Sequence, residues 1–491
     1  MNKLSLVAAL VATSVSLEAF SFSSFLSNAS EKVSNIRTIH ELNKDQRDYR
    51  RNQSGLVTAN TAAEWINDWV ANKPANVNGR LFVMQVGLLP GATPFIKHDD
   101  VNVYTFDRTA GCTGTGDIRN DGISDIPMPI FGGGAPNGMD GAFWAYDINP
   151  NEDMLLVVVA SDEPKNMALA TRFLWTMNYW GMKSDHISMM NGTAMYMFDP
   201  KLNPKIKRAG VKSKESMFTA MGSEYLMAPN GRLDFGSQEE GAQRNPALRM
   251  NFQSIKMLPA KEQFSLFASM EDIMNVVDAD DTNNVLIDGR GADEYNANVS
   301  VKRSKTESSE CGVNHDQQCY SAIEGHIKGA VNLEYRGVIN TDDYVKDLNG
   351  DGKVDSRDSS MTFKSKRELK RTFKKLGVKR GSDIYTYCRT GTRASLITFA
   401  SFEILKYKTH MYDGSWIQWS KLADAKDTYG NQMIPADSPW RTDVARYTEN
   451  VTYNDSVDVG PASKTLNAYA GVGEGNAIVE EDNAYRFTFP E

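Results

Sequence analysis

One of the four cysteines of the 491-residue chain lies in a segment that favours an ionised thiol. Cys388 stands within YTYCRTGTRAS, where Arg389 and Arg393 supply two fixed positive charges. The residues before it predict a strand and those from about Ala394 predict a helix, which leaves CRTGTR as the connecting loop. Positive charges and a helix N-terminus both stabilise a thiolate. The loop therefore predicts nucleophilic, covalent catalysis at Cys388.

The other residues of this loop suit the binding of an anion. Gly391 allows a tight turn where a Cβ atom would collide with the loop. Thr390 and Thr392 can donate hydroxyl hydrogen bonds, and backbone N–H groups can point towards the sulfur. The alternative is an inert buried cysteine at a strand end, which two neighbouring arginines and a glycine disfavour.

Two segments of the chain repeat one pattern, and this pattern predicts the elements that position the loop. In each segment a buried strand, a short loop, an amphipathic helix and a second short strand follow one another, at 152–192 and at 381–414. Further strands are expected upstream of each, at 80–87 and 284–295, and turns that end in Gly-Ala occur at 137–148 and 324–335. Strands that alternate with helices predict an α/β fold with two parallel sheets.

The charge of the chain limits its partners. The net charge is −8, which argues against nucleic acid as the main partner. The basic run at 364–381 is a local exception, and it predicts the solvated face of a helix whose apolar side carries Leu369, Phe373 and Leu376.

The start of the chain predicts an export signal. A lysine precedes an apolar run at 4–17, which is too short to span a membrane and ends before Ala19. We expect a periplasmic or secreted protein with no membrane span after cleavage. The predicted segments are a signal peptide (1–19), an N-terminal arm (20–54), a first α/β unit (55–200), a linker (201–260), a second unit (261–425) and a C-terminal extension (426–491).

Five motifs in the second unit resemble, in order, those of the rhodanese (thiosulfate sulfurtransferase) family. They are LIDGRGADEY, EGHIKGAVNL, FKSKRELKRTFKKLGV, YTYCRTGTRAS and YDGSWIQW. The resemblance covers about residues 56–420 and implies two rhodanese-like domains, each a parallel-stranded sheet flanked by helices. Two-domain members carry the reactive cysteine only in the second domain. Asp162 stands at the corresponding position of the first unit, which agrees with a catalytically silent domain.

The resemblance implies a sulfurtransferase that needs no cofactor for catalysis. Cys388 would take a sulfane sulfur from thiosulfate or polysulfide as a persulfide and pass it to cyanide or a thiol. Related phosphatases have five residues between cysteine and arginine, whereas four separate Cys388 from Arg393, which favours sulfur over phosphate. Arg389 replaces the small uncharged residue of mercaptopyruvate-specific members and favours an anionic donor. The alternative is a periplasmic sulfur-binding carrier that delivers sulfur to a partner reductase.

Other positions of the resemblance have supporting roles. It implies that Asp288 supports the site and that Arg290 binds substrate, although Arg290 could instead form a local ion pair with Glu294. His326 matches a structural turn of the family. Trp416 and Trp419 follow an Asp-Gly turn, and we expect them to pack rather than react.

A twelve-residue segment within the second unit fits the pattern of a calcium-binding loop and resembles those of EF-hands and dockerins. It is DLNGDGKVDSRD, at 347–358, with Gly352 at the turn position and an aspartate rather than a glutamate at position 12. We expect structural Ca²⁺, and the alternative is an acidic turn that binds no metal. A similar segment at 117–125 is interrupted by Arg119. The expected ligands are Asp347, Asn349, Asp351, Lys353 (through its carbonyl), Asp355 and Asp358.

The remaining cysteines lie in polar segments. Cys311 and Cys319 are eight residues apart, and an oxidising compartment favours a disulfide between them. A zinc site that includes His315 is the weaker alternative, because no fourth ligand is evident. Cys112 is left as a loop thiol of unknown state.

Overall fold

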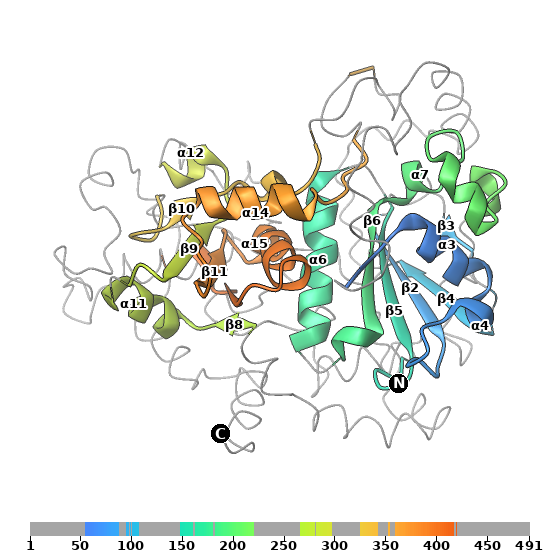
Figure 1. The fold of residues 1–491 in the computed structure, drawn as a ribbon, viewed down its shortest axis with the longest axis horizontal. Coiled ribbons are helices and arrows are strands. Elements are labelled where there is room, and N and C mark those ends of the chain that lie inside the picture. Colours follow the sequence, from blue (N-terminus) through green and yellow to red (C-terminus); the bar gives the residue numbers. More distant parts are fainter. Residues whose placement is uncertain are drawn as a thin grey trace, which may run out of the picture.

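The computed structural model describes two α/β units that lie side by side (Figure 1). The described residues are 55–87, 95–97, 99, 101–107, 148–160, 163–179, 182–219, 266–279, 281–296, 325–341, 352–353, 359–416 and 419. The expected signal peptide, N-terminal arm and C-terminal extension, and most of the expected linker, lie outside these residues.

The first unit is built on a five-stranded parallel sheet in the order β1-β6-β5-β2-β4. Its strands are β1 (Leu56–Val57), β2 (Leu81–Val86), β4 (Val103–Asp107), β5 (Met154–Val159) and β6 (Ile187–Thr193). All six residues of β5, MLLVVV, are buried, as expected for a strand that is covered on both faces of a parallel sheet. A separate antiparallel pair joins β3 (Phe95–Ile96) to β7 (Phe218–Thr219).

The second unit repeats this architecture in the order β10-β9-β11-β12-β8. Its strands are β8 (Phe267–Ala268), β9 (Asn284–Asp288), β10 (Val331–Asn332), β11 (Asp383–Tyr387) and β12 (Thr409–Tyr412). If the five strands of each parallel sheet are numbered along the chain, both sheets have the order 1-5-4-2-3. The predicted repeat and the α/β fold with two parallel sheets are therefore confirmed.

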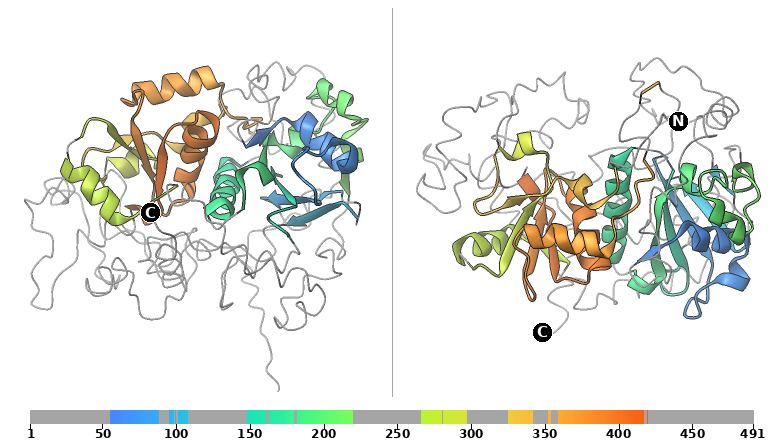
Figure 2. Two further views of the ribbon diagram at one scale, coloured as in Figure 1. Left: turned by 60° about the horizontal axis from the view of Figure 1, so that its bottom comes forward. Right: turned by 45° about the horizontal axis from the view of Figure 1, so that its top comes forward.

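Helices flank both sheets (Figure 2). In the first unit they are α3 (Ala59–Asn67), α4 (Trp69–Asn72), α6 (Pro164–Tyr179) and α7 (Ala194–Met197). In the second unit they are α11 (Met270–Ala279), α12 (Ala292–Tyr295), α14 (Lys366–Lys375) and α15 (Thr392–Thr398), which continues as a π-helix over Phe399–Ile404. Short 3₁₀ segments occur at Ser184–His186, Pro204–Ala209, Lys214–Ser216 and Tyr335–Val338.

Helix α14 illustrates how local sequence sets these elements. Ser365 and Glu368 form a reciprocal capping box at its N-terminus. Leu369 and Phe373 are buried, and the basic residues cover the outer face. The predicted amphipathic helix with a solvated basic face is thus confirmed.

The two units share a core where α6 packs against α15 (Figures 1 and 2). One buried cluster contains residues from both sheets, including Val157 of β5 and Ile384 of β11. The hydroxyl groups of Thr171 and Ser395 are hydrogen-bonded across this interface at 3.0 Å. This hydrogen bond therefore holds α6 against the start of α15, although the two helices are far apart in sequence.

Residues 204–219 pack into the first unit, although they fall within the expected linker. Ile206, Val211 and Phe218 belong to the core of that unit, and Asn60 and Asn67 of α3 donate hydrogen bonds to carbonyls at 205 and 209. Among the helices of the described ranges, none combines the length and apolar character that crossing a membrane requires.

Candidate active site

Three strands of the second sheet end at one edge, and the chemically distinctive residues gather there. Asp288 is the last residue of β9, Cys388 follows β11, and Asp413 follows β12. The three strands are parallel neighbours, so their carboxyl ends meet at the same edge of the sheet. The backbone N–H of Gly289 donates to the carbonyl of Tyr387 at 2.7 Å, which ties the ends of β9 and β11 together.

Cys388 is enclosed at this edge. It is a free thiol and only 1% exposed. Its backbone N–H donates to Ser415 Oγ at 3.4 Å, and its carbonyl accepts from the N–H of Trp416 at 3.0 Å. It packs in a small cluster that includes Trp175 of α6 in the first unit. Cys388 therefore packs in a cluster to which both units contribute, and its backbone is bonded to the loop after β12.

Gly391 shapes the loop that follows the cysteine. Its φ of +83° lies in the left-handed region, and it is the N-cap of α15. A Cβ atom at this position would lie 2.2 Å from Asp413 Oδ1 and 2.9 Å from Arg172 Nη1. Both the backbone conformation and the space thus require glycine here, as the sequence predicted.

The two loop arginines converge on one carboxylate that the sequence analysis did not assign to the site. Arg389 Nε donates to Glu294 Oε1 at 3.0 Å, and Arg393 Nη2 donates to the same oxygen at 2.9 Å. Arg393 Nη1 also donates to Oε2 of Glu294. Glu294 lies on α12, six residues beyond the end of β9, and it fixes both arginines beside the loop.

The charged groups of this cluster shift the pKa values of Glu294 and Arg393. Burial acts to raise the pKa of Glu294, but hydrogen bonds and charge from Arg393, with the charges of Arg389 and Arg290, lower it well below its ordinary value. Burial acts to lower the pKa of Arg393, yet Glu294 outweighs it and raises this pKa. The nearby Cys388 acts on the pKa of Arg393 in the same direction.

Arg290 and Asp288 form a separate buried pair. Both side chains are fully buried, and Arg290 donates from Nη2 to Asp288 Oδ2 at 2.6 Å and from Nε to Oδ1 at 3.0 Å. Nη2 also donates to the carbonyl of Gly325, and the guanidinium lies 4.6 Å from the centre of the Trp416 ring. This geometry supports a structural role for Arg290, whose ion-pair partner is Asp288, whereas Glu294 pairs with the loop arginines.

The loop hydroxyl of Thr392 is available to an anion. Its Oγ1 atom is buried and has no hydrogen-bond partner among the described residues. Thr390 is half-buried in the same loop. A buried hydroxyl that lacks a partner is costly, so a ligand that accepts from Thr392 would relieve that cost.

The first unit supplies a residue that the sequence analysis did not single out. Arg172 of α6 is 1% exposed and pairs with Asp413, which is fully buried in the second unit. The sequence signal was a lone arginine within the apolar helix ALATRFLWTM. The local sequence gave weaker indication that Glu294 belongs to the site, because only the folded sheet brings this residue to the loop.

His326, Trp416 and Trp419 were predicted to have supporting roles. His326 Nδ1 lies 2.9 Å from the carbonyl of Tyr295, and its ring stacks on Tyr295 at 3.9 Å between centroids. Trp416 and Trp419 are buried in one apolar cluster, so the prediction that they pack is confirmed.

Several predicted positions lie outside the described residues. These include Asp162, the cysteines 112, 311 and 319, and the calcium-loop residues Asp347, Asn349, Asp351, Asp355 and Asp358. Of that loop only Gly352 and Lys353 are described, and Gly352 has a φ of +86°, which fits the turn expected at this position.

Residues 272–422 match the Rhodanese-like domain family. Among curated proteins, the chain resembles two proteins named "Putative thiosulfate sulfurtransferase". The one from Haloferax volcanii is 28% identical over 176 residues, and the one from Mycolicibacterium smegmatis is 30% identical over 173 residues. Each match covers 35% of this chain and 51% of the relative. The sulfur carrier protein TtuD of Thermus thermophilus is 33% identical over 109 residues, which cover 22% of this chain and 32% of TtuD. The chain thus spans about half of the first two relatives and a third of TtuD.

Solved structures resemble more of the chain at lower identity. Tum1 of Saccharomyces cerevisiae matches with a TM-score of 0.42 and 15% identity, covering 74% of this chain and 94% of Tum1. SseA of Escherichia coli, a 3-mercaptopyruvate sulfotransferase, matches with a TM-score of 0.40 and 16% identity, covering 74% of this chain and 99% of SseA. The matched residues 272–422 include Cys388 with its loop, Glu294 and Asp413, whereas Arg172 lies outside them.

Proposed function

We propose that the protein is a sulfurtransferase that carries a sulfane sulfur on Cys388. The supporting observation is the site itself, a free cysteine at the end of a central strand, in a loop that carries Arg389 and Arg393 and lies within the residues that match the Rhodanese-like domain family. The relatives named as thiosulfate sulfurtransferases agree with this activity, and thiosulfate or polysulfide is the proposed donor.

The charges around the loop favour an anionic sulfur. The described ion pairs at this edge hold four guanidinium groups and three carboxylates, from Arg172, Arg290, Arg389, Arg393, Asp288, Glu294 and Asp413. Guanidinium groups beside a thiol stabilise a negative charge on it. A thiolate or a persulfide anion on Cys388 would therefore be favoured beside Arg389 and Arg393.

The proposed reaction has two steps. The Cys388 thiolate attacks the outer sulfur of thiosulfate, the S–S bond breaks, and sulfite leaves with the bonding electron pair. Cyanide or a thiolate then attacks the outer sulfur of the Cys388 persulfide, and the cysteine departs as a thiolate. Arg389, Arg393 and the Thr392 hydroxyl stabilise the anions formed in both steps.

Intact-mass analysis after thiosulfate treatment tests this proposal. We expect a gain of one sulfur atom that maps to Cys388, and thiocyanate when cyanide is added. Cys388→Ser should show neither, while its circular dichroism spectrum stays that of the wild type. Sulfur transfer that persists in Cys388→Ser would place the chemistry elsewhere.

A second candidate function is that of a sulfur carrier, because one relative is named a sulfur carrier protein. Both functions need the same persulfide. Steady-state assays with excess thiosulfate and cyanide separate them, because an enzyme releases many thiocyanate ions per protein whereas a carrier releases about one until a partner protein is present.

The other predictions from the sequence remain proposals that rest on the motifs alone. We propose export to the periplasm or the medium, structural Ca²⁺ in the loop at 347–358, and a disulfide between Cys311 and Cys319. Mass analysis of the mature N-terminus and of non-reduced peptides tests the first and the third.

A further inference from the structure

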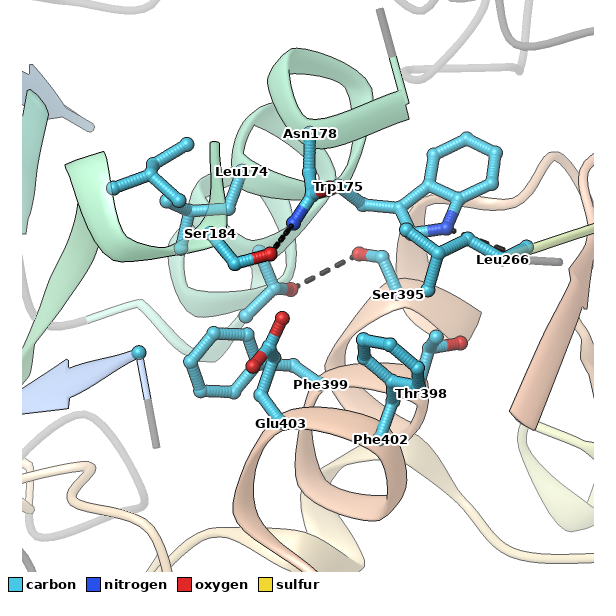
Figure 3. A pocket seen from close by; sticks show the side chains of 13 residues that line it. Leu174, Trp175, Asn178, Ser184, Leu266, Ser395, Thr398, Phe399, Phe402 and Glu403 are labelled. Carbon is cyan, nitrogen blue, oxygen red and sulfur yellow. Dashed lines mark hydrogen bonds between the residues drawn. The ribbon is translucent and has the colours of Figure 1, made fainter. Parts of the chain in front are cut away.

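The contact between α6 and the cysteine loop links the first unit to the proposed chemistry. Thr171 and Ser395 are hydrogen-bonded across the interface, and Ser395 Oγ also donates to the carbonyl of Ala168 at 3.0 Å. Figure 3 shows α6 and α15 facing each other, with Trp175 and Ser395 on the walls of the hollow between them. The start of α15 is thus held by α6.

Arg172 directly follows Thr171 in α6, and its side chain reaches the cysteine loop itself. Its guanidinium pairs with Asp413 and lies 4.8 Å from the centre of the Trp175 ring. Trp175 Nε1 donates in turn to the carbonyl of Leu266 at 3.3 Å and packs in the same cluster as Cys388. The backbone of Gly391 lies directly against both members of the pair, since an added Cβ would approach each within 3 Å.

We propose that Arg172 is a positioning residue for sulfur transfer at Cys388, supplied by the first unit. This inference rests on the proposed function, because it assigns a role in that reaction. Arg172 fixes Asp413, and the pair forms the surface on which the loop turns at Gly391. The turn sets the direction of the peptide groups between Cys388 and Arg393, and with it the approach of the sulfur to its donor.

The guanidinium fits this role better than a simple ammonium. Nη1 carries the bond to Asp413, while Nη2 is buried and has no hydrogen-bond partner among the described residues. The planar guanidinium pairs with Asp413 through Nη1 and also lies 4.8 Å from the centre of the Trp175 ring, whereas a lysine offers one compact charge. A residue kept only to balance Asp413 would be replaceable by lysine, and a residue that positions the loop would not.

Four variants test this assignment in the full-length protein. They are Arg172→Lys, Arg172→Met, the double variant Arg172→Met with Asp413→Leu, and the control Arg80→Met. Arg80 directly precedes β2 and pairs with Asp153, which directly precedes β5, so this pair lies at the amino ends of two strands of the first sheet. Each variant is measured for Tm, for kcat and KM with thiosulfate and cyanide, and for the pH profile of Cys388 alkylation by iodoacetamide, followed at the peptide level.

The expected results separate positioning from stability. Arg172→Lys and Arg172→Met should lower kcat by about tenfold or more, because small misplacements of reacting groups are costly, and KM should change far less. The alkylation profile of Cys388 should shift in both. The apolar double variant should regain Tm without regaining kcat, since replacing a buried ion pair with apolar residues is often neutral for stability. Arg80→Met should lower Tm and leave kcat unchanged.

Other outcomes overturn the inference. A folded Arg172→Lys with wild-type kcat and alkylation profile refutes it, as does recovery of kcat together with Tm in the double variant. If Arg172→Met does not fold, Arg172→Lys decides. If the wild type gains no sulfur from thiosulfate, the proposed function fails separately, and the alkylation profiles still show whether Arg172 acts on Cys388.

Discussion

Replacing Glu294 with glutamine should weaken the fold in a way that depends on pH. The carboxylate accepts hydrogen bonds from both Arg389 and Arg393, and its side chain is 14% exposed. Breaking a buried ion pair costs about 3–5 kcal/mol, and the partial exposure of Arg393 places this case at about 3 kcal/mol. A unit of this size then loses roughly 6–12 °C in Tm.

The sign of the pH effect follows from the pKa of Glu294. Its pKa in the folded protein lies below the ordinary value of 4.5, so its contribution is fully present above that value. The contribution is lost as pH falls through the lower pKa of the folded state. The difference in unfolding free energy between wild type and Glu294→Gln should therefore be constant from pH 7 to about 5 and should shrink as pH falls below 4.5.

Urea unfolding followed by circular dichroism at a series of pH values measures this difference. Glu334→Gln is the matched control, because Glu334 pairs with Arg336 at a site where the two side chains are 30% and 45% exposed. That variant should change stability by less than about 1 kcal/mol. A Glu294→Gln protein as stable as the wild type at pH 7, or a difference that persists unchanged to pH 3, would refute the assigned geometry.

Three further changes have expected outcomes. Gly391→Ala should lower Tm and abolish thiosulfate-dependent thiocyanate formation, because its Cβ would meet Asp413 Oδ1 at 2.2 Å and its φ is +83°; wild-type kinetics would contradict this. Arg389→Ala should raise KM for thiosulfate about tenfold, the loss expected for one charged hydrogen bond, and affect a neutral organic trisulfide less; equal losses would argue against a charge role. Chelation with EGTA should lower Tm if the loop at 347–358 binds Ca²⁺, since buried residues Ser359 and Ser360 follow it directly, and an unchanged midpoint would count against the metal.

Much of the fold was predictable because the repeated pattern is strong. Strands such as MLLVVV are buried on both faces, and the helix at Lys366–Lys375 carries its own cap and apolar stripe. Those signals are local, and the structure confirmed them. The partners of the loop arginines were not predictable from local sequence, because Glu294 lies 95 residues from Arg389.

The sequence by itself determined which reactive and anion-binding residues are present: Cys388, followed by Arg389, Gly391 and Arg393 in a strand–loop–helix unit. Those features depend on residue type and on spacing within a few positions, which a linear chain records directly. Only the tertiary structure decided which charges neutralise which. It brought Arg172 of one unit onto Asp413 of the other, against Gly391, because parallel strands end at a common edge and α6 packs on α15 there. Contacts of this kind arise from packing between distant segments, and no local pattern encodes them.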